Sequence, residues 1–298
     1  MYKPLLKKFF LSTAALFFAM LVLPQQAQAQ EPVNYELKLA GMRVSSLNCD
    51  DLSSIDGVSG TAKFDPESKT LTLDNATIST SVIKFPGLEN SIKGLTIRLI
   101  GDNTITSENY WGLFNNTERS ITFTGSGKLT VNGSTTAPQT GYRRAIFNWG
   151  TIVVDGCTLE ANGGVYGIGS GFWKFVNCNV RTKGGGGSQS DEYAGSLTWM
   201  WDKEPEFVGC KITSPAGVSW KKFQNNGYDN YVLVGEDGNA VTDWVEITRD
   251  NTGVNAPNTE AATAKRGIYT LQGLRLPGEL KDLPAGIYIV DGKKVVKP

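Results

Sequence analysis

Short runs that alternate apolar and polar residues, separated by turn-forming residues, make up most of the chain after residue 30. Strict alternation is typical of half-buried β-strands, because successive side chains of a strand point to opposite faces. Apolar residues at helical spacing are nearly absent from this part of the sequence. The pattern therefore predicts an all-β fold built from short strands.

A degenerate repeat occupies the middle of the chain. Each of its six units has a short alternating strand, a compact or turn-forming residue and a second short strand; the units are residues 71–79, 97–106, 121–131, 152–160, 175–181 and 207–213. Aligned on the second strand, they give one apolar column, Ile78, Ile105, Leu129, Leu159, Val180 and Ile212. Ahead of it lies a column in which Asn and Gly predominate, Asn75, Asp102, Ser126, Gly156, Asn177 and Gly209. Gly, Asn and Asp tolerate positive φ at low cost, so this second column predicts a sharp corner within each unit.

A third short strand follows most units and would direct Leu113, Ile146, Ile168 and Leu197 inward. Self-similarity over one supersecondary unit is the signature of a solenoid. We therefore predict a right-handed parallel β-helix with capping strands over residues 30–250. An antiparallel β-sandwich is the alternative, since it also contains short strands at regular intervals.

The ends of the chain differ in composition from its middle. Residues 34–64 predict an N-terminal strand cap, and residues 228–248 predict a hairpin around Gly235 to Gly238 that caps the other end. The polar residues 251–266 read as a linker. Residues 267–298 predict a small C-terminal β tail of three short strands, with turns at Pro277-Gly278 and Asp291-Gly292.

The first 29 residues have the order of a secretory signal peptide: Lys3, Lys7 and Lys8, an apolar run over residues 9–23, and the small-x-small triplet 27–29. An uncleaved membrane anchor is the alternative, but the run is shorter than the roughly 20 apolar residues that a span needs. No later segment is apolar enough to cross a membrane. We predict an exported protein in the extracellular space, on the outer cell surface or in the periplasm.

Charge and composition narrow the function. After loss of the three leader lysines, 26 basic residues stand against 29 acidic ones, a net charge of −3, so the chain has no basic footprint for nucleic acid. Histidine, the commonest general base and metal ligand, is absent. No other catalytic motif is recognisable, and we predict no enzyme, no cofactor and no metal site.

Three of the four cysteines, Cys157, Cys178 and Cys210, fall in one column of the repeat. A metal site would need His or a C-x-x-C pair, and neither occurs. Free cysteine is among the most buried residue types, so stacked thiols in the core are the favoured interpretation. A Cys157–Cys178 disulfide between adjacent coils is the alternative.

Aromatic residues are concentrated between residues 110 and 220. Exposed flat rings with polar neighbours are a common way to bind sugars, and the candidate ligand-binding residues are Trp111, Tyr142, Trp149, Trp173, Trp199 and Trp201. Trp199 and Trp201 alternate, so both are predicted to face one side of a strand. The competing interpretation places half or more of the aromatic rings in the core or over loop bases.

Two resemblances add to this picture. Residues 34–215, with the text around Phe64-Asp65-Pro66 and Leu95 to Ile105, resemble secreted Bacteroidota proteins described as carbohydrate-binding-domain-containing. Residues 267–298, with Leu283-Pro284-Ala285-Gly286-Ile287-Tyr288, resemble C-terminal sorting domains of the type IX secretion system in the same phylum. The resemblances imply a β-helical glycan-binding domain and a partnership between the tail and secretion machinery.

The sequence thus favours a secreted or surface-displayed, non-catalytic protein that binds glycans. One alternative is a structural or adhesive protein that binds host or bacterial surface proteins. A polysaccharide lyase or hydrolase is the second alternative, because β-helices also carry such enzymes and a fold does not fix a function. Carboxylates such as Asp191, Glu192, Asp202, Glu204 and Glu206 could serve hydrolysis, but solvated surface charge is the favoured interpretation.

Overall fold

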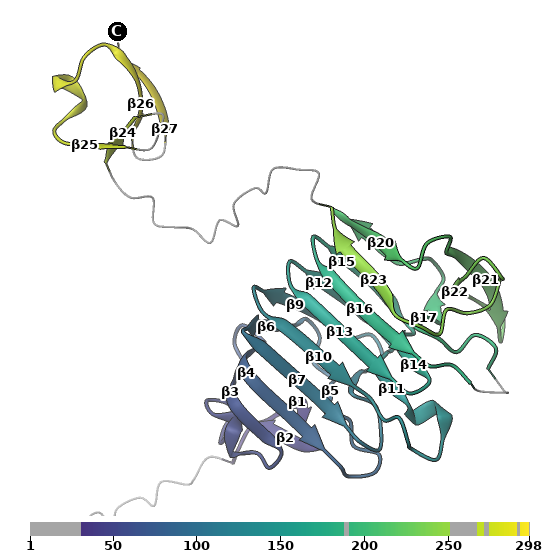
Figure 1. The fold of residues 1–298 in the computed structure, drawn as a ribbon. Helices are drawn as coiled ribbons and strands as arrows, with labels where there is room; N and C mark the ends of the chain where they lie inside the picture. Colours follow the sequence, from purple (N-terminus) through teal and green to yellow (C-terminus); the bar gives the residue numbers. More distant parts are fainter. Residues whose placement is uncertain (1–30, 188–190, 251–266, 271–273, 291–292, 298) are drawn as a thin grey trace, which may run out of the picture. The chain divides into compact units, whose positions relative to one another are not determined.

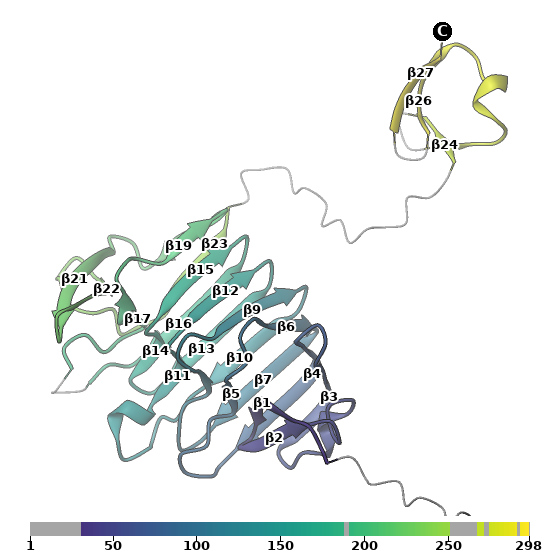
Figure 2. The ribbon, with the colours of Figure 1, turned by 180° about the vertical axis from the view of Figure 1, so that it is seen from behind.

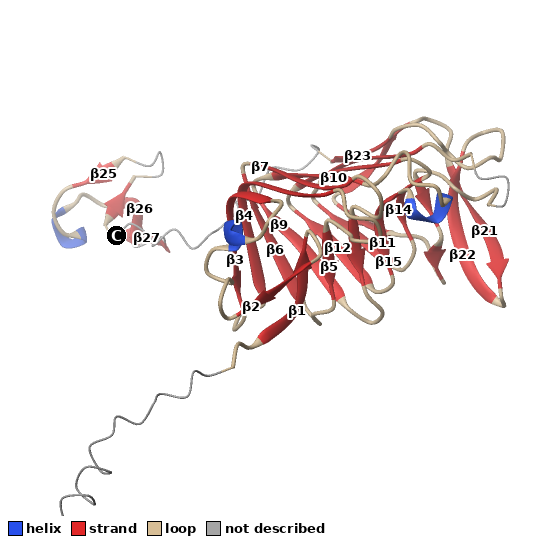
Figure 3. Cartoon of the chain, turned by 90° about the horizontal axis from the view of Figure 1, so that it is seen from below, coloured by secondary structure: helices blue, strands red, loops and turns tan. Residues whose placement is uncertain are grey.

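The computed structural model describes residues 31–187, 191–250, 267–270, 274–290 and 293–297. The fold is all-β, with 56% strand and 3% helix, and its helix is limited to short turns beside strands (Figure 3). The described residues fall into two compact units, one ending at Arg249 and one beyond it. The predicted signal peptide, residues 1–29, and the predicted linker, residues 251–266, lie outside the described residues.

Three ladders of parallel strands make up the larger unit (Figure 1). Ladder 1 contains β5 (Leu88–Asn90), β8 (Leu113–Asn115), β11 (Arg144–Asn148), β14 (Tyr166–Gly169) and β17 (Leu197–Thr198). Ladder 2 contains the first half of β4 (Thr70–Thr80), then β6 (Leu95–Ile100), β9 (Ser120–Gly125), β12 (Thr151–Asp155), β15 (Phe172–Val176) and β19 (Glu206–Val208). Ladder 3 contains the second half of β4, then β7 (Asp102–Ser107), β10 (Lys128–Asn132), β13 (Thr158–Gly163) and β16 (Asn179–Gly184).

In chain order the backbone visits ladders 1, 2 and 3 and then begins again, so each coil of three strands stacks on the previous coil (Figure 2). The parallel pairing excludes the antiparallel sandwich as a description of this unit. The predicted inward positions of ladder 1 are confirmed, because Leu113, Ile146, Ile168 and Leu197 are register partners and fully buried. Their burial between the ladders forms one continuous apolar core.

The predicted corners lie between ladders 2 and 3. Positive φ occurs at Asn75, Gly101, Gly125, Gly156, Asn177 and Gly209. The prediction is confirmed at four units and wrong by one residue at two, where the preceding glycine rather than Asp102 or Ser126 takes the left-handed conformation. Glycine adopts it without steric cost, which explains why it takes the corner where both residues are present.

The predicted apolar column of the second strands is wrong in register at one step and is interrupted at its last step, where Ile247 lies between Val180 and Ile212. Ile105 pairs with Val131, and Leu129 pairs with Asn103, so the two halves of the column are offset by two residues. Strand side chains repeat every two residues, and an offset of two leaves the same face inward. Ile105 and Leu129 are accordingly both buried, as predicted.

A buried stack of asparagines runs along the end of ladder 1. Asn90 Nδ2 donates to Asn115 Oδ1 at 2.8 Å, and Asn115 Nδ2 donates to Asn148 Oδ1 at 2.8 Å. Each amide also bonds backbone groups of the turn that follows its strand. The stack therefore satisfies buried polar groups and fixes the corner between ladders 1 and 2.

Antiparallel strands close the first coil, in the part of the chain where the sequence predicts a strand cap, residues 34–64. Strands β1 (Asn34–Leu39) and β2 (Met42–Ser45) extend ladder 1 beyond β5, and β3 (Val58–Asp65) pairs with β4 after the short helix η1 (Leu52–Ser54). A solenoid that ended on an unpaired parallel strand would expose a row of backbone groups, and the reversed strands remove part of that edge.

The other end is closed differently from the prediction. Strands β21 (Ser219–Asn225) and β22 (Tyr228–Val234) form the hairpin, and β18 (Met200–Trp201) pairs with β22. Strand β23 (Val245–Arg249) does not pair with β22; it inserts antiparallel between β16 and β20 (Cys210–Ser214). The predicted hairpin around Gly235 to Gly238 is therefore confirmed only as a short reversal, in which Val234 pairs antiparallel with Ala240 and Val241 N donates to Leu233 O at 3.0 Å; its extension to residue 248 is wrong. The sixth repeat unit continues ladder 2 but not ladder 3, because β23 occupies the place beside β16.

The smaller unit is a four-stranded antiparallel sheet of β24 (Ile268–Tyr269), β25 (Arg275–Leu276), β26 (Gly286–Val290) and β27 (Lys293–Lys297), with η3 (Leu280–Asp282) before β26. It has one strand more than the sequence predicts. In the described ranges of both units, no helix combines the length and apolar composition needed to cross a bilayer.

Candidate ligand-binding site

The candidate site begins where the chain leaves ladder 1. Trp199 follows β17 with a φ of 56°, and the next residues belong to a different sheet. This left-handed residue breaks the strand, so the prediction that Trp199 and Trp201 alternate along one strand is wrong. The two rings nevertheless border the same hollow, because the turn redirects the chain across the start of β15.

A tight hairpin forms the opposite wall. Asn226 and Gly227 both have positive φ, at 51° and 83°, between Asn225 and Tyr228, which pair across the turn. Asn-Gly is the preferred sequence for such two-residue turns, because both central residues must adopt positive φ. The dipeptide is the sequence signal that could have located this hairpin.

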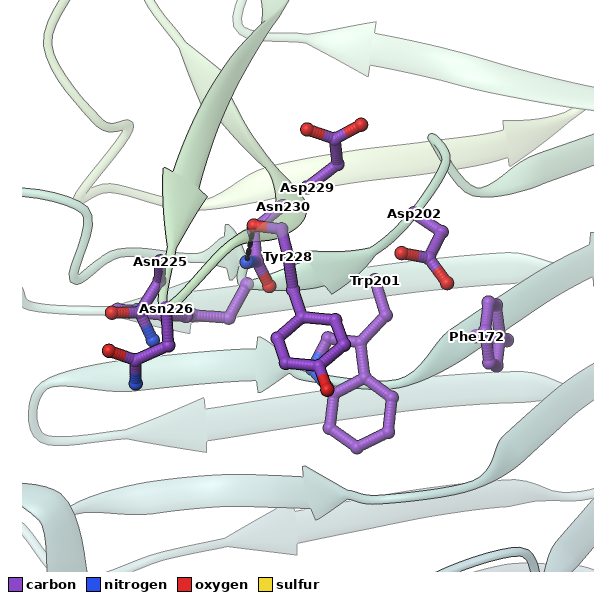
Figure 4. Close-up of a pocket in the computed structure, with 9 residues that line it drawn as sticks. Phe172, Trp201, Asp202, Asn225, Asn226, Tyr228, Asp229 and Asn230 are labelled. Atoms are coloured by element: carbon purple, nitrogen blue, oxygen red, sulfur yellow. Dashed lines mark hydrogen bonds between the residues drawn. The ribbon is translucent and has the colours of Figure 1, made fainter.

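Between these walls lies hollow 1, a cavity of about 500 Å³. Its lining residues are Phe172, Trp199, Trp201, Asp202, Asn225, Asn226, Tyr228, Asp229 and Asn230 (Figure 4). The size falls within the range of small-molecule sites. Sequence reasoning found only Trp199 and Trp201 of this set and missed the hairpin residues.

The walls of hollow 1 are fixed by backbone pairing. Trp201 N donates to Gly171 O at 3.0 Å, and Asp202 N donates to Asp229 O at 3.0 Å. The Trp201 ring meets Phe172 edge to face, with centroids 6.2 Å apart. Tyr228 is 72% exposed and projects from the hairpin tip. The Trp201 ring is thus held on one side by Phe172, whereas the Tyr228 ring is largely open to solvent.

The polar groups of hollow 1 are amides and carboxylates. Asn230 is buried and donates to Tyr228 O at 3.1 Å. Asp229 pairs with Lys222 at 2.7 Å, and the hydrogen bond from Lys222 holds the pKa of Asp229 below its usual range. Asp202 is exposed and has no ion-pair partner in the described part of the chain.

Hollow 2, of about 390 Å³, lies on the other side of shared residues Trp199 and Asn225. Its remaining lining residues are Asp191, Glu192, Tyr193, Phe223 and Gln224. Tyr193 stacks on Phe223 with centroids 3.8 Å apart. Asp191 Oδ2 accepts from the Trp199 indole at 2.9 Å and from Tyr166 OH at 2.8 Å, which fixes the indole between the two hollows.

A separate aromatic cluster covers the outer face of ladder 1. It consists of Tyr110, Trp111, Phe114, Tyr142, Phe147 and Trp149, with neighbouring centroids 4.1–6.5 Å apart. Three predicted residues, Trp111, Tyr142 and Trp149, lie in it. Trp149 is 39% exposed, while the indole of Trp111 donates to Gly141 O at 2.8 Å.

Arg144 connects this outer cluster to the hollows. Its guanidinium lies 4.5 Å from the Phe147 centroid and 3.7 Å from the Tyr166 centroid. Burial lowers the pKa of Arg144, and its Nη1 is buried without a hydrogen-bond partner among the described residues. Stacking between two rings is the geometry in which a guanidinium gains cation–π stabilisation.

Trp173, the sixth predicted residue, lies in the core. It is 3% exposed, stacks on Phe175 and donates its indole N–H to Ser170 O at 2.7 Å. Strand β15 turns this position inward, so the ring has no free face for a ligand. The predicted set is thus divided among hollow 1, the outer cluster and the core.

The cysteines are buried and unpaired, so the disulfide alternative is wrong. Cys157 and Cys178 lie at the same position of adjacent coils, and Cys210 Sγ donates to Phe175 O at 3.4 Å. Burial raises the pKa of Cys157 to about 12 and raises that of Cys178 further. Within the described ranges, no three Cys, Asp or Glu residues are placed to hold a metal ion.

Comparison of the chain with protein-family models, with curated proteins and with solved structures found no match. The chemistry of the two hollows is therefore the basis for a functional hypothesis. Hollow 1 combines flat apolar faces with amide and carboxylate groups around one opening, and this combination suits a ligand that carries both C–H faces and hydroxyl groups.

Proposed function

We propose that the larger unit is a right-handed parallel β-helix that binds glycans without catalysis at hollow 1. The coil order supports the fold assignment, because strands that return to parallel neighbours through crossovers are almost always connected with a right-handed turn. The chain would display the site at one end of a rigid stack of coils.

One observation carries the glycan hypothesis: Trp201 and Tyr228 present ring faces around an opening that also holds Asn225, Asn226 and Asn230. Sugar rings have apolar C–H faces and equatorial hydroxyls, so they need an aromatic platform and nearby amide partners. The backbone pairing around Trp201 and Asp202 places these groups before a ligand arrives, which lowers the entropy cost of binding.

The test is a broad glycan array probed with the full-length chain and two single variants. Tyr228→Ala removes an exposed ring from hollow 1, and Trp149→Ala removes an exposed ring from the outer cluster. We expect Tyr228→Ala to abolish selective binding and Trp149→Ala to retain it, with circular dichroism confirming that both variants are folded. Loss only in Trp149→Ala would move the site to ladder 1.

The alternatives make different predictions in the same experiment. A folded chain that binds no glycan would favour a structural or adhesive protein that recognises host or bacterial surface proteins. Shortening of bound oligosaccharides during incubation, followed by mass spectrometry, would favour a lyase or hydrolase and overturn the non-catalytic proposal.

We further propose that the chain is exported and that its smaller unit is a sorting segment read by type IX secretion machinery. Its antiparallel strands include the Gly286–Val290 and Lys293–Lys297 segments that carry the resemblance. Fusion of residues 267–298 to a periplasmic reporter, expressed in a bacterium with this system, should bring the reporter to the cell surface. Retention in the periplasm would contradict the proposal.

A further inference from the structure

We infer that the paired hollows select neutral or amino-bearing glycans and reject glycans that carry carboxylate or sulfate groups. This inference rests on the proposed glycan-binding function and adds the chemical class of the ligand.

The charged side chains that line both hollows are all carboxylates. The ionisable carboxylates are Asp202 and Asp229 in hollow 1 and Asp191 and Glu192 in hollow 2, and neither lining contains Lys or Arg. Proteins that bind anionic groups generally supply guanidinium or ammonium donors, most often the bidentate fork of arginine. The hollows therefore lack the group that an acidic sugar requires.

The four carboxylates differ in how far neighbouring groups oppose their negative charge. Asp229 is paired with Lys222 at 2.7 Å, and Asp191 accepts from Trp199 and Tyr166 and feels the charge of Arg144. Asp202 and Glu192 have no ion-pair partner in the described residues. Each hollow thus keeps one unopposed negative charge on its rim.

Cations outside the two linings could offset the negative charge at the rims. Lys222 is engaged by Asp229, and Lys221 lies 5.6 Å from the ring centroid of Tyr193, a lining residue of hollow 2. Arg144 is buried between Phe147 and Tyr166. Lys221 reduces the negative potential at hollow 2, and Lys203, which follows Asp202 and also acts on Glu206, reduces it at hollow 1, but neither lysine lines a hollow.

The charge of a ligand determines how the rim carboxylates affect its binding. A carboxylate or sulfate placed near Asp202 is repelled, and the repulsion is strongest at low ionic strength, where screening is weak. A protonated amine in the same place is attracted by the same rim charge. A neutral sugar binds through rings and amides alone, and its affinity is insensitive to salt.

The experiment uses matched glycans and the full-length chain. The pairs are lactosamine with its sialylated and sulfated forms, and chitotetraose with its de-N-acetylated form, titrated calorimetrically at low and at physiological salt. We expect acidic forms to bind about tenfold or more weakly than neutral ones at low salt. We expect the amine form to bind more tightly and to lose this advantage as salt rises.

The matched variant is Asp202→Asn, which keeps the shape and removes the charge. Measured relative to the neutral glycan of each pair in the same variant, the affinity deficit of the acidic forms should shrink and the affinity gain of the amine form should disappear, whatever the substitution does to neutral binding itself. Acidic glycans that bind as well as neutral ones, in a manner lost in Tyr228→Ala, would overturn the charge inference and leave the proposed function standing. A folded chain that binds none of these glycans and nothing on the array would overturn both.

Discussion

The stacked coils and the C-terminal end of the larger unit obey different rules. In the coils, the inner strands of each ladder have a parallel neighbour on both sides, and inward positions of one strand face inward positions of the next. Beyond Thr198 only β19 continues a parallel ladder; β18, β20, β21, β22 and β23 pair antiparallel, and rings such as Tyr228 are exposed. The stack is stabilised by repeated packing of its buried residues. At the irregular end the side chains are not constrained by a repeated neighbour, so they can line a binding site.

The largest expected loss of stability follows from a substitution that creates a cavity inside the stack. Phe123 is fully buried in ladder 2 between Ile97 and Val154. Phe123→Ala should lower the free energy of unfolding by about 3–5 kcal/mol, because it removes buried apolar surface and leaves a void. Urea denaturation followed by far-UV circular dichroism measures the change.

Tyr228→Ala is the matched aromatic deletion at the irregular end. Because Tyr228 is mostly exposed, its loss should change the free energy of unfolding by less than about 0.5 kcal/mol. If Phe123→Ala and Tyr228→Ala lowered the free energy of unfolding equally, the stack would not be the more stabilising of the two regions.

The asparagine stack gives the next largest effect. Asn115→Ala removes the acceptor of one buried Asn90 N–H and one of the two donors to the Arg119 carbonyl, which keeps its bond from Thr151 N. An unsatisfied buried polar group costs about 1–3 kcal/mol. Asn225→Ala, on the exposed hairpin, is the control. A double-mutant cycle with Asn148→Ala should show strong non-additivity, since the two amides are hydrogen bonded to each other.

The same contrast explains what the sequence could predict. In the stack, alternation placed Leu113, Ile146, Ile168 and Leu197 correctly, because each coil repeats the constraint of its neighbour. A register error of two residues between Ile105 and Leu129 was harmless, because it preserved the face. Where a strand has no repeating neighbour, the sequence contains no second copy of the signal.

At the irregular end, one backbone conformation decided the outcome. The left-handed turn at Trp199 separates it from Trp201, and nothing in a single Trp-Met-Trp sequence distinguishes this from a continuous strand. The insertion of β23 beside β16 depends on tertiary pairing across more than 60 residues. Two turns carried a local signal: Gly235 to Gly238, which the sequence analysis used, and Asn226-Gly227, which would have placed Tyr228 and Asn225 at a hairpin tip.

Glycines with positive φ sharpen the comparison at smaller energies. Gly156, at a coil corner, and Gly227, in the hairpin turn, have φ of 72° and 83°, and a Cβ at either position meets no atom within 4 Å. Alanine at either site should therefore cost only the left-handed backbone strain, about 1–2 kcal/mol.

The two alanine variants should differ in whether the backbone strain lowers global stability or only local stability. Gly156→Ala should lower the global free energy of unfolding, because the corner belongs to the cooperative stack. Gly227→Ala should instead speed amide exchange in β21 and β22 and weaken glycan binding, with little global change. Slower exchange in the hairpin of Gly227→Ala would contradict this.

The smallest effect concerns the boundary between the two regions, where Lys174 in β15 pairs with Glu206 in β19 at 2.8 Å. The hydrogen bond from Lys174 lowers the pKa of Glu206 below its ordinary value. A carboxyl group with a depressed folded-state pKa contributes stability above its unfolded pKa and loses it as the pH falls through the folded value. Both groups are substantially exposed, so the contribution to stability is small. NMR titration of the Glu206 carboxyl carbon should show the lowered pKa, and Lys174→Met should return it toward its ordinary range; an unchanged titration would mean that the last strand of ladder 2 is not held by this pair.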